Sequence, residues 1–226
     1  MKQHIKRLAT PPTWDIARKE ETYIMRPNPG SQAFAYVLPL GVVIRMTKVA
    51  TTLKEIKYIL SQDKVQVDGK VRKDHKFAVG FLSTISIPDD KKQFRLSLTT
   101  KGTLALVPIS EPDAHVKIAK VTDILKRKDG FSVTTSDGRM FKAAKKSAAT
   151  NGSVLFTVPG QEVKETFALS EGNCAFIIAG KHPGILGTIK TIDATGVTIH
   201  AKDGTFSVNK GNLIVVGKDK PAITLA

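Results

Sequence analysis

The sequence predicts a multidomain, predominantly β protein that carries one small α+β domain near its N-terminus. Helical patterns are concentrated in residues 41–80, where two helices precede a short hairpin, and are nearly absent after residue 80. After residue 80, short runs rich in β-branched and aromatic residues alternate with turn residues. Asp-Gly pairs at 129–130, 137–138 and 203–204 lie between such runs, which indicates hairpins and small barrels rather than parallel sheets with crossover helices.

The charge balance indicates an anionic partner. The chain has 226 residues, enough for one or more cores, with 35 Lys and Arg against 20 Asp and Glu, for a formal net charge of +15. A soluble protein this basic is typical of nucleic-acid binding. Residues 1–80 hold fifteen Lys and Arg against seven acids, so the charge is densest in this part of the chain.

Several classes of protein are disfavoured. No run of 18 apolar residues occurs, so no membrane span is expected, and the first residues lack the apolar core of a signal peptide. The single cysteine, Cys174, cannot form an internal disulfide and is expected to be buried as a small hydrophobic residue. A reducing, cytoplasmic setting fits this composition.

The first 32 residues are expected to form an extension rather than a domain. The stretch "HIKRLATPPTWDIARKEETYIMRPNPGSQ" mixes cations with prolines and glycines and has no sustained period. Its lone tryptophan, Trp14, has two interpretations: it stacks on a nucleobase, or it anchors the extension in a hydrophobic pocket of its own protein.

A helix is predicted to begin after Thr52. Thr52 and Glu55 have the spacing of a capping box, in which each residue satisfies a backbone N–H of the first turn. Apolar residues at three- and four-residue spacings define one packed face. These residues are Leu53, Ile56, Ile59 and Leu60. Lys54 and Lys57 lie away from that face, toward solvent or a ligand.

The stretch "DKVQVDGKVRKD", residues 63–74, predicts a basic hairpin. Val65 and Val67 alternate with polar residues, and Asp68-Gly69 is a typical two-residue turn. Strand alternation places the cations together on the face opposite the valines. The hairpin is either an ordinary surface feature or a finger that fits a polyanion.

No catalytic, metal or cofactor site can be assembled from local spacing. The five histidines are scattered without metal-ligand spacing, and Asp89-Asp90 is expected to be a solvated turn. The glycine-rich stretch 179–188, "AGKHPGILGT", lacks the terminal Gly-Lys-Ser/Thr of a phosphate-binding loop and is expected to be a tight turn with Lys181 and His182 at its tip.

Taken together, the motifs resemble a known family along nearly the whole chain. They are "HIKRLATPPTW", "LPLGVVIRMTKVATTLKEIKYILSQDKVQVDGKVRKDHKFAVGFLSTISI", "FRLSLTTKG", "GNCAFIIAGKHPGILGTI" and "NLIVVGKDKPAITL". In this order they are similar to the archaeal and eukaryotic type of small-subunit ribosomal protein number four.

The resemblance implies a fold and its boundaries. We expect an N-terminal basic extension at 1–40, an αL-type RNA-binding domain at 41–110, a central β-barrel-like domain at 111–172 and an SH3-like KOW barrel at 173–226. It also implies the RNA-binding residues. They are Lys2, His4, Lys6, Arg7, Arg45, Lys48, Lys54, Lys57, Lys64, Lys70, Arg72, Lys73, Lys76, Lys181 and His182.

Two departures from the family pattern concern RNA contact. Only three residues precede His4, where the family commonly has a longer basic lead, so the extension reaches less far. In the KOW loop the family commonly has Asn and Arg where this chain has His182 and Ile185, so the cationic contact at the second position is lost. We expect Lys181 to compensate.

The resemblance implies a structural component of the small ribosomal subunit that binds and stabilises ribosomal RNA. We expect no catalytic activity, metal or cofactor, no membrane association and no homo-oligomer. The partners are small-subunit ribosomal RNA and neighbouring ribosomal proteins in the cytoplasm. Two alternatives stay open: an RNA-modifying enzyme targeted by an αL domain, and a KOW-containing transcription or translation factor that binds reversibly.

Overall fold

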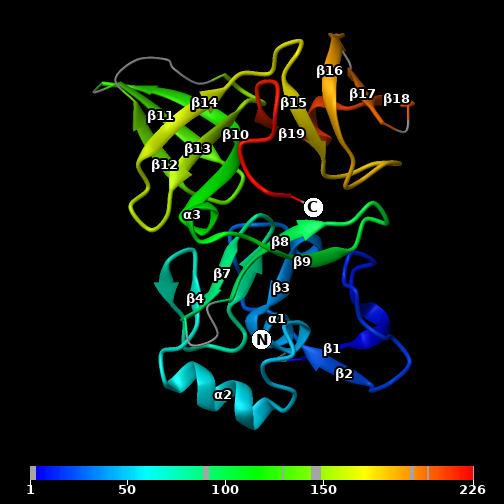
Figure 1. Ribbon diagram of the computed structural model, residues 1–226, viewed down its shortest axis with the longest axis vertical. Helices are drawn as coiled ribbons and strands as arrows, with labels where there is room; N and C mark the ends of the chain where they lie inside the picture. Colours follow the sequence, from blue (N-terminus) through cyan, green and yellow to red (C-terminus); the bar gives the residue numbers. More distant parts are fainter. Residues whose placement is uncertain are drawn as a thin grey trace. The chain divides into compact units, whose positions relative to one another are not determined.

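The computed structural model describes residues 4–88, 92–128, 130–143, 149–193, 196–202 and 204–225. The chain divides into two compact units (Figure 1). The N-terminal unit comprises Met1–Ser97 and Thr103–His115, and the C-terminal unit comprises Leu98–Gly102 and Val116–Ala226. No helix in the described ranges is long and apolar enough to cross a membrane.

The N-terminal unit is built on one five-stranded sheet with strand order β5-β4-β7-β8-β9. Its strands are β4 (Gln66–Val67), β5 (Lys70–Val71), β7 (Thr84–Ile87), β8 (Lys92–Leu98) and β9 (Leu104–Pro108). Two short pairs accompany it. They are β1 (His4–Lys6) with β2 (Tyr23–Met25), and β3 (Val37–Pro39) with β6 (Ala78–Gly80).

In the described part of this unit, three α-helices and two short 3-10 helices accompany the sheets. They are α1 (Leu40–Met46), α2 (Leu53–Ser61), α3 (Glu111–Ala114), η1 (Arg7–Ala9) and η2 (Phe34–Tyr36). Figure 1 shows α2 along the outer edge of the unit. The helix-helix-hairpin order predicted for residues 41–80 is confirmed.

Helix α2 begins as the sequence predicts. The Thr52 hydroxyl accepts a hydrogen bond from the Glu55 amide at 3.3 Å, and the Glu55 carboxylate accepts one from the Thr52 amide at 3.2 Å. Hydrogen bonds from the Thr52 and Thr51 amides to this carboxylate hold the pKa of Glu55 below its usual value. The packed face is narrower than predicted, because Ile56 and Leu60 are fully buried whereas Leu53, the first residue of the helix, is 38% exposed.

The C-terminal unit consists of two five-stranded antiparallel sheets. The first has the order β12-β11-β10-β13-β14. It contains β10 (Val116–Arg127), β11 (Gly130–Thr135), β12 (Met140–Ala143), β13 (Ser153–Thr157) and β14 (Val163–Phe167). Its core includes Val121, Val133 and Val154, with the rings of Phe141 and Phe156 5.0 Å apart.

The second sheet has the order β18-β17-β16-β15-β19. It contains β15 (Cys174–Ile177), β16 (Leu186–Ile192), β17 (Val197–Ala201), β18 (Gly204–Val208) and β19 (Leu213–Gly217), with the 3-10 helix η4 (Lys210–Asn212) before the last strand. Cys174 is buried, as expected, and burial raises the pKa of its thiol. The predicted multidomain, predominantly β fold is confirmed, and the finer boundaries at residues 40, 110 and 172 stay predictions.

Trp14 anchors the N-terminal extension in its own protein. Its side chain is 2% exposed, and its ring lies 5.5 Å from that of Phe34. The backbone beside it joins β9, because the Leu104 amide donates to the Thr13 carbonyl at 2.6 Å. Of the two interpretations of Trp14, the intramolecular anchor is the one that the structure shows.

The burial difference along α2 gives a direct test of the fold. We expect Ile56→Ala to lower the free energy of unfolding by about 2–5 kcal/mol, because it removes buried methylene groups and leaves a cavity. Leu53→Ala on the same helix is the matched control and should cost less than about 1 kcal/mol, since that side chain is partly in water. Urea denaturation followed by circular dichroism measures both, and equal losses would contradict this packing.

Candidate nucleic-acid interface

The hairpin of β4 and β5 places its cations away from the core. Gln66 pairs with Val71 and Val67 pairs with Lys70, so Asp68-Gly69 forms a two-residue turn with φ of 51° and 70°. Positive φ at both central positions is the type I′ geometry that matches strand twist. Asp68 Oδ1 also accepts a hydrogen bond from the Thr84 amide at 3.0 Å, which ties the turn to β7.

Burial alternates along β4 as the sequence predicts. Val65 and Val67 are 0% and 2% exposed, whereas Lys64 is half-buried and Lys70 is exposed. Val71 is 42% exposed, because β5 lies at the edge of the sheet. The hairpin therefore presents an exposed lysine beside an apolar edge.

The helical cations lie on the same unit. Lys54 and Lys57 are exposed on α2, on the side away from Ile56 and Leu60. Lys48 is exposed after α1 with a φ of 59°, and Arg45 is half-buried at the end of α1. Lys54, Lys57 and Lys48 are thus available to a ligand.

Three further predicted cations near the hairpin also make contacts within the unit. The Arg72 guanidinium lies over the Phe77 ring, 4.2 Å from its centroid, a cation–π arrangement. Lys73 Nζ lies 3.1 Å from Asp63 Oδ1, an ion pair of two exposed groups. Lys76 is half-buried, and its amide donates to Asp74 Oδ1 at 2.8 Å. These residues help to shape the surface on which they lie.

The extension divides its predicted residues between surface and interior. His4 and Lys6 are exposed, and the His4 ring packs edge-to-face on Tyr23 with centroids 4.7 Å apart. Arg7 is 8% exposed and donates to the Ala17 carbonyl at 2.7 Å, so it organises the extension from inside. Lys2 lies outside the described residues.

The buried position of Arg7 is closed by two acidic side chains. Its guanidinium lies 3.2 Å from Glu20 Oε2 and 3.1 Å from Glu21 Oε2. A guanidinium with several internal acceptors has few donors left for phosphate, so the structure lends Arg7 no support as an RNA contact.

Lys181 and His182 belong to the C-terminal unit, whereas the other predicted residues belong to the N-terminal unit. Both are exposed, at a turn in which Gly184 adopts a φ of 79°. The His182 ring lies 4.2 Å from that of Phe206. The loop therefore offers one lysine and a histidine ring that packs on Phe206 of β18. Contact between this loop and RNA stays a prediction.

Sequence reasoning missed cations that the fold buries. Arg95 is 0% exposed and donates to the Asp113 carbonyl at 2.7 Å, and burial lowers its pKa to about 10. Lys117 lies 3.5 Å from Asp137, which also contacts Arg139 at 3.1 Å. The position of Lys117 and Lys120 inside the apolar run "VKIAKV", residues 116–121, is a sequence signal that could have indicated burial.

Lys120 joins the two sheets of the C-terminal unit. Its Nζ donates to the carbonyls of Lys210 at 2.6 Å and Gly211 at 2.9 Å, both in η4. Burial of this ammonium group lowers the pKa of Lys120 from 10.5 to about 8. Ser153 on β13 donates to the Val215 carbonyl on β19, a second link between the sheets.

Comparison with known proteins finds relatives along the whole chain. The model of the "Ribosomal family S4e" matches residues 90–163, and the model of the "RS4NT (NUC023) domain" matches residues 1–31. Small ribosomal subunit protein eS4 of Methanocella arvoryzae is 35% identical over 228 residues, which cover 97% of this chain and 96% of the relative. The eS4 protein of Methanocaldococcus jannaschii is 34% identical, with 99% and 98% covered.

A solved structure shares the fold. The crystal structure of the 30S ribosomal protein S4e from Thermoplasma acidophilum matches with a TM-score of 0.70 and 27% sequence identity. The match covers 84% of this chain and 98% of that chain.

The Lys120 contacts predict how stability changes with pH. The folded state releases the proton near pH 8 and the unfolded state near 10.5, so between these values the unfolded state binds more protons. The free energy of unfolding of the wild type, relative to that of Lys120→Met, should therefore rise as the pH increases from 8 toward 10.5. Urea unfolding at pH 7 to 10 measures this difference. Lys126→Met, which removes an exposed lysine of β10, is the control. If the free energy of unfolding of Lys120→Met changes with pH in parallel with that of the wild type, the lowered pKa of Lys120 is contradicted.

Proposed function

Because the chain belongs to the ribosomal S4e family, we propose that it is a structural constituent of the small ribosomal subunit that binds and stabilises ribosomal RNA in translation. The observation that carries this proposal is the near-complete alignment with curated eS4 proteins, which spans 97% and 99% of the chain in two relatives. The net charge of +15 supports it, since an RNA ligand supplies the opposite charge.

We infer that exposed lysines of the N-terminal unit make the first contacts with RNA phosphates. Lys54 and Lys57 on α2 and Lys70 on the hairpin combine exposure with a rigid backbone. Lysine neutralises phosphate and releases condensed counterions, so this part of the binding free energy depends strongly on salt. Double-stranded RNA is recognised largely through its shape and backbone, for which such side chains suffice.

The remaining predicted cations form a second group. Arg45, Lys64 and Lys76 are half-buried, and Arg72 and Lys73 also contact Phe77 and Asp63. A preorganised cation loses less conformational freedom on binding than a free one. We place these residues, with Lys48 and the exposed His4 and Lys6, in the proposed interface, together with Lys181 and His182 of the C-terminal unit.

The family assignment disfavours the alternative functions. Family members carry names of ribosomal proteins, which fits a structural role rather than a catalysed modification of RNA or reversible regulation. We infer that the chain resides in cytoplasmic ribosomes, next to other ribosomal proteins.

Sedimentation tests the proposed function directly. Cell lysate is run through a high-salt gradient, and the protein is quantified against small-subunit RNA in each fraction. We expect about one copy per small subunit after the salt wash, as for an integral constituent; a protein held by phosphate contacts alone would be released, because such contacts weaken steeply as salt rises. Release to the top of the gradient would contradict an integral role.

A triple substitution tests the phosphate contacts. Lys54→Ala, Lys57→Ala and Lys70→Ala together should weaken binding to small-subunit RNA and reduce the slope of log K against log salt by about 0.7 to 0.9 for each lost contact. The matched control replaces three exposed lysines of the C-terminal unit that are outside the predicted set, Lys126, Lys164 and Lys202. Filter binding at several salt concentrations measures both, and identical slopes would remove these three lysines from the interface.

A further inference from the structure

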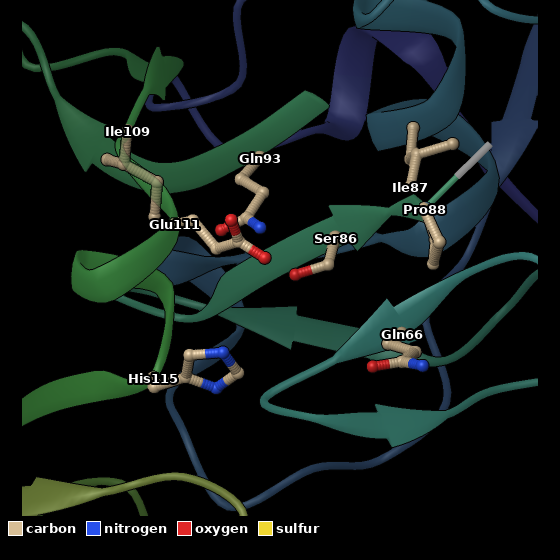
Figure 2. A pocket seen from close by; sticks show the side chains of 8 residues that line it. All are labelled: Gln66, Ser86, Ile87, Pro88, Gln93, Ile109, Glu111 and His115. Atoms are coloured by element: carbon tan, nitrogen blue, oxygen red, sulfur yellow. The ribbon is translucent and has the colours of Figure 1, made fainter. Parts of the chain in front are cut away.

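The N-terminal unit contains a polar pocket that the phosphate contacts do not use. Its volume is about 420 Å³, enough for a nucleobase with its ribose. Figure 2 shows the side chains that line it. They are Gln66, Ser86, Ile87, Pro88, Gln93, Ile109, Glu111 and His115.

One wall of the pocket is a row of hydrogen-bonding side chains on adjacent strands. Gln66 on β4 pairs with Ser86 on β7, and Ser86 pairs with Gln93 on β8. Directly paired residues lie on the same face of a sheet, so the row presents an amide, a hydroxyl and an amide in succession. Gln66 belongs to the basic hairpin, which therefore contributes both to the cationic surface and to this wall.

The opposite wall comes from α3 and the residue that follows it. Glu111 and His115 both line the pocket, and Figure 2 places the Glu111 carboxylate close to Ser86 and Gln93 in the view. The buried Arg95 guanidinium donates to the Asp113 carbonyl of α3, so the sheet holds this helix in place. Most of the lining residues thus belong to strands β4, β7 and β8 or to α3, and Pro88, Ile109 and His115 directly follow such elements.

Two acceptors that line the pocket have no donor in the part of the chain that the structure describes. Gln93 Oε1 is buried and has no hydrogen-bond partner in the described ranges. The Glu111 carboxylate forms no ion pair with any residue of those ranges. A buried acceptor without a donor costs free energy, which a ligand with N–H groups would recover. A carboxylate at the same place repels phosphate, so the ligand is not a phosphate group.

We propose that this pocket binds an unpaired nucleobase of RNA, with guanine as the preferred base. The inference rests on the proposed function, because it takes RNA as the partner. Single-stranded bases are recognised on their Watson–Crick edges by polar side chains. Guanine presents two adjacent donors there, N1–H and the N2 amino group, and they match a carboxylate and an amide oxygen. Adenine and cytosine present a donor beside an acceptor, and uracil presents one donor between two acceptors.

Binding of short RNAs tests this pocket. The probes are the heptamer UUUGUUU and its counterparts with A, C or U at the centre, measured with the full chain by fluorescence anisotropy. We expect the guanine heptamer to bind about five-fold to 150-fold more tightly than the others, the range for one good bidentate contact. Glu111→Gln should abolish this preference. Glu171→Gln, at an exposed position in the C-terminal unit, is the matched control and should retain it.

The outcomes separate this inference from the proposed function. Equal affinity of the wild type for all four heptamers, or a preference that survives Glu111→Gln, overturns the base pocket. The peptide Gly-Arg-Gly can also be tested as a competitor. If it displaces the guanine heptamer at a lower concentration than unlabelled guanine heptamer does, the pocket binds a protein side chain, and the base-pocket proposal is overturned. Co-sedimentation with the small subunit is measured on the same preparations. Wild-type protein that co-sediments but shows no base preference overturns the base pocket and leaves the proposed function intact. Wild-type protein that does not co-sediment contradicts both the proposed function and the base pocket that rests on it.

Discussion

The register of the β4–β5 hairpin is the constraint on which the proposed interface depends. A shift of one residue would turn Val65 and Val67 outward and bury Lys64 and Gln66 instead, because side chains alternate across a sheet. The two-residue turn and the contact between Asp68 and Thr84 fix this register at the C-terminal end of β4, where the chain turns into β5. The same register places Gln66 beside Ser86, so the cationic surface and the polar pocket have one structural origin.

The protein uses its positive charge in two ways. Some cations are buried and bind backbone carbonyls or carboxylates, as Arg95 does with Asp113, Lys120 with η4 and Arg7 with Glu20 and Glu21. Others, such as Lys54 and Lys70, remain in water. Buried charges need internal partners, since their loss of hydration is costly. The net charge of +15 therefore overstates the charge that an RNA ligand meets.

Features set by local interactions could be predicted from the sequence, and features set by distant ones could not. The Thr52–Glu55 capping box and the Asp68-Gly69 turn involve neighbouring residues, so their chemistry is visible in the sequence. Lys120 contacts a carbonyl 90 residues away, and the pocket joins β4 to α3 across more than forty positions. The spacing of residues within a short stretch of sequence does not indicate contacts between residues this far apart. For the same reason Arg7 looked like its exposed neighbour Lys6, although the acids that surround it lie 13 and 14 residues later.

The anchored extension has a consequence for the free energy of assembly. Trp14 packs on Phe34, Thr13 joins β9, and β1 pairs with β2, so residues 4–25 have a defined conformation in the chain by itself. A segment that is ordered before it meets its partner does not pay its conformational entropy at the encounter. The cost is met once, when the protein folds, and more of the contact energy of this segment is then available to hold the assembled particle together.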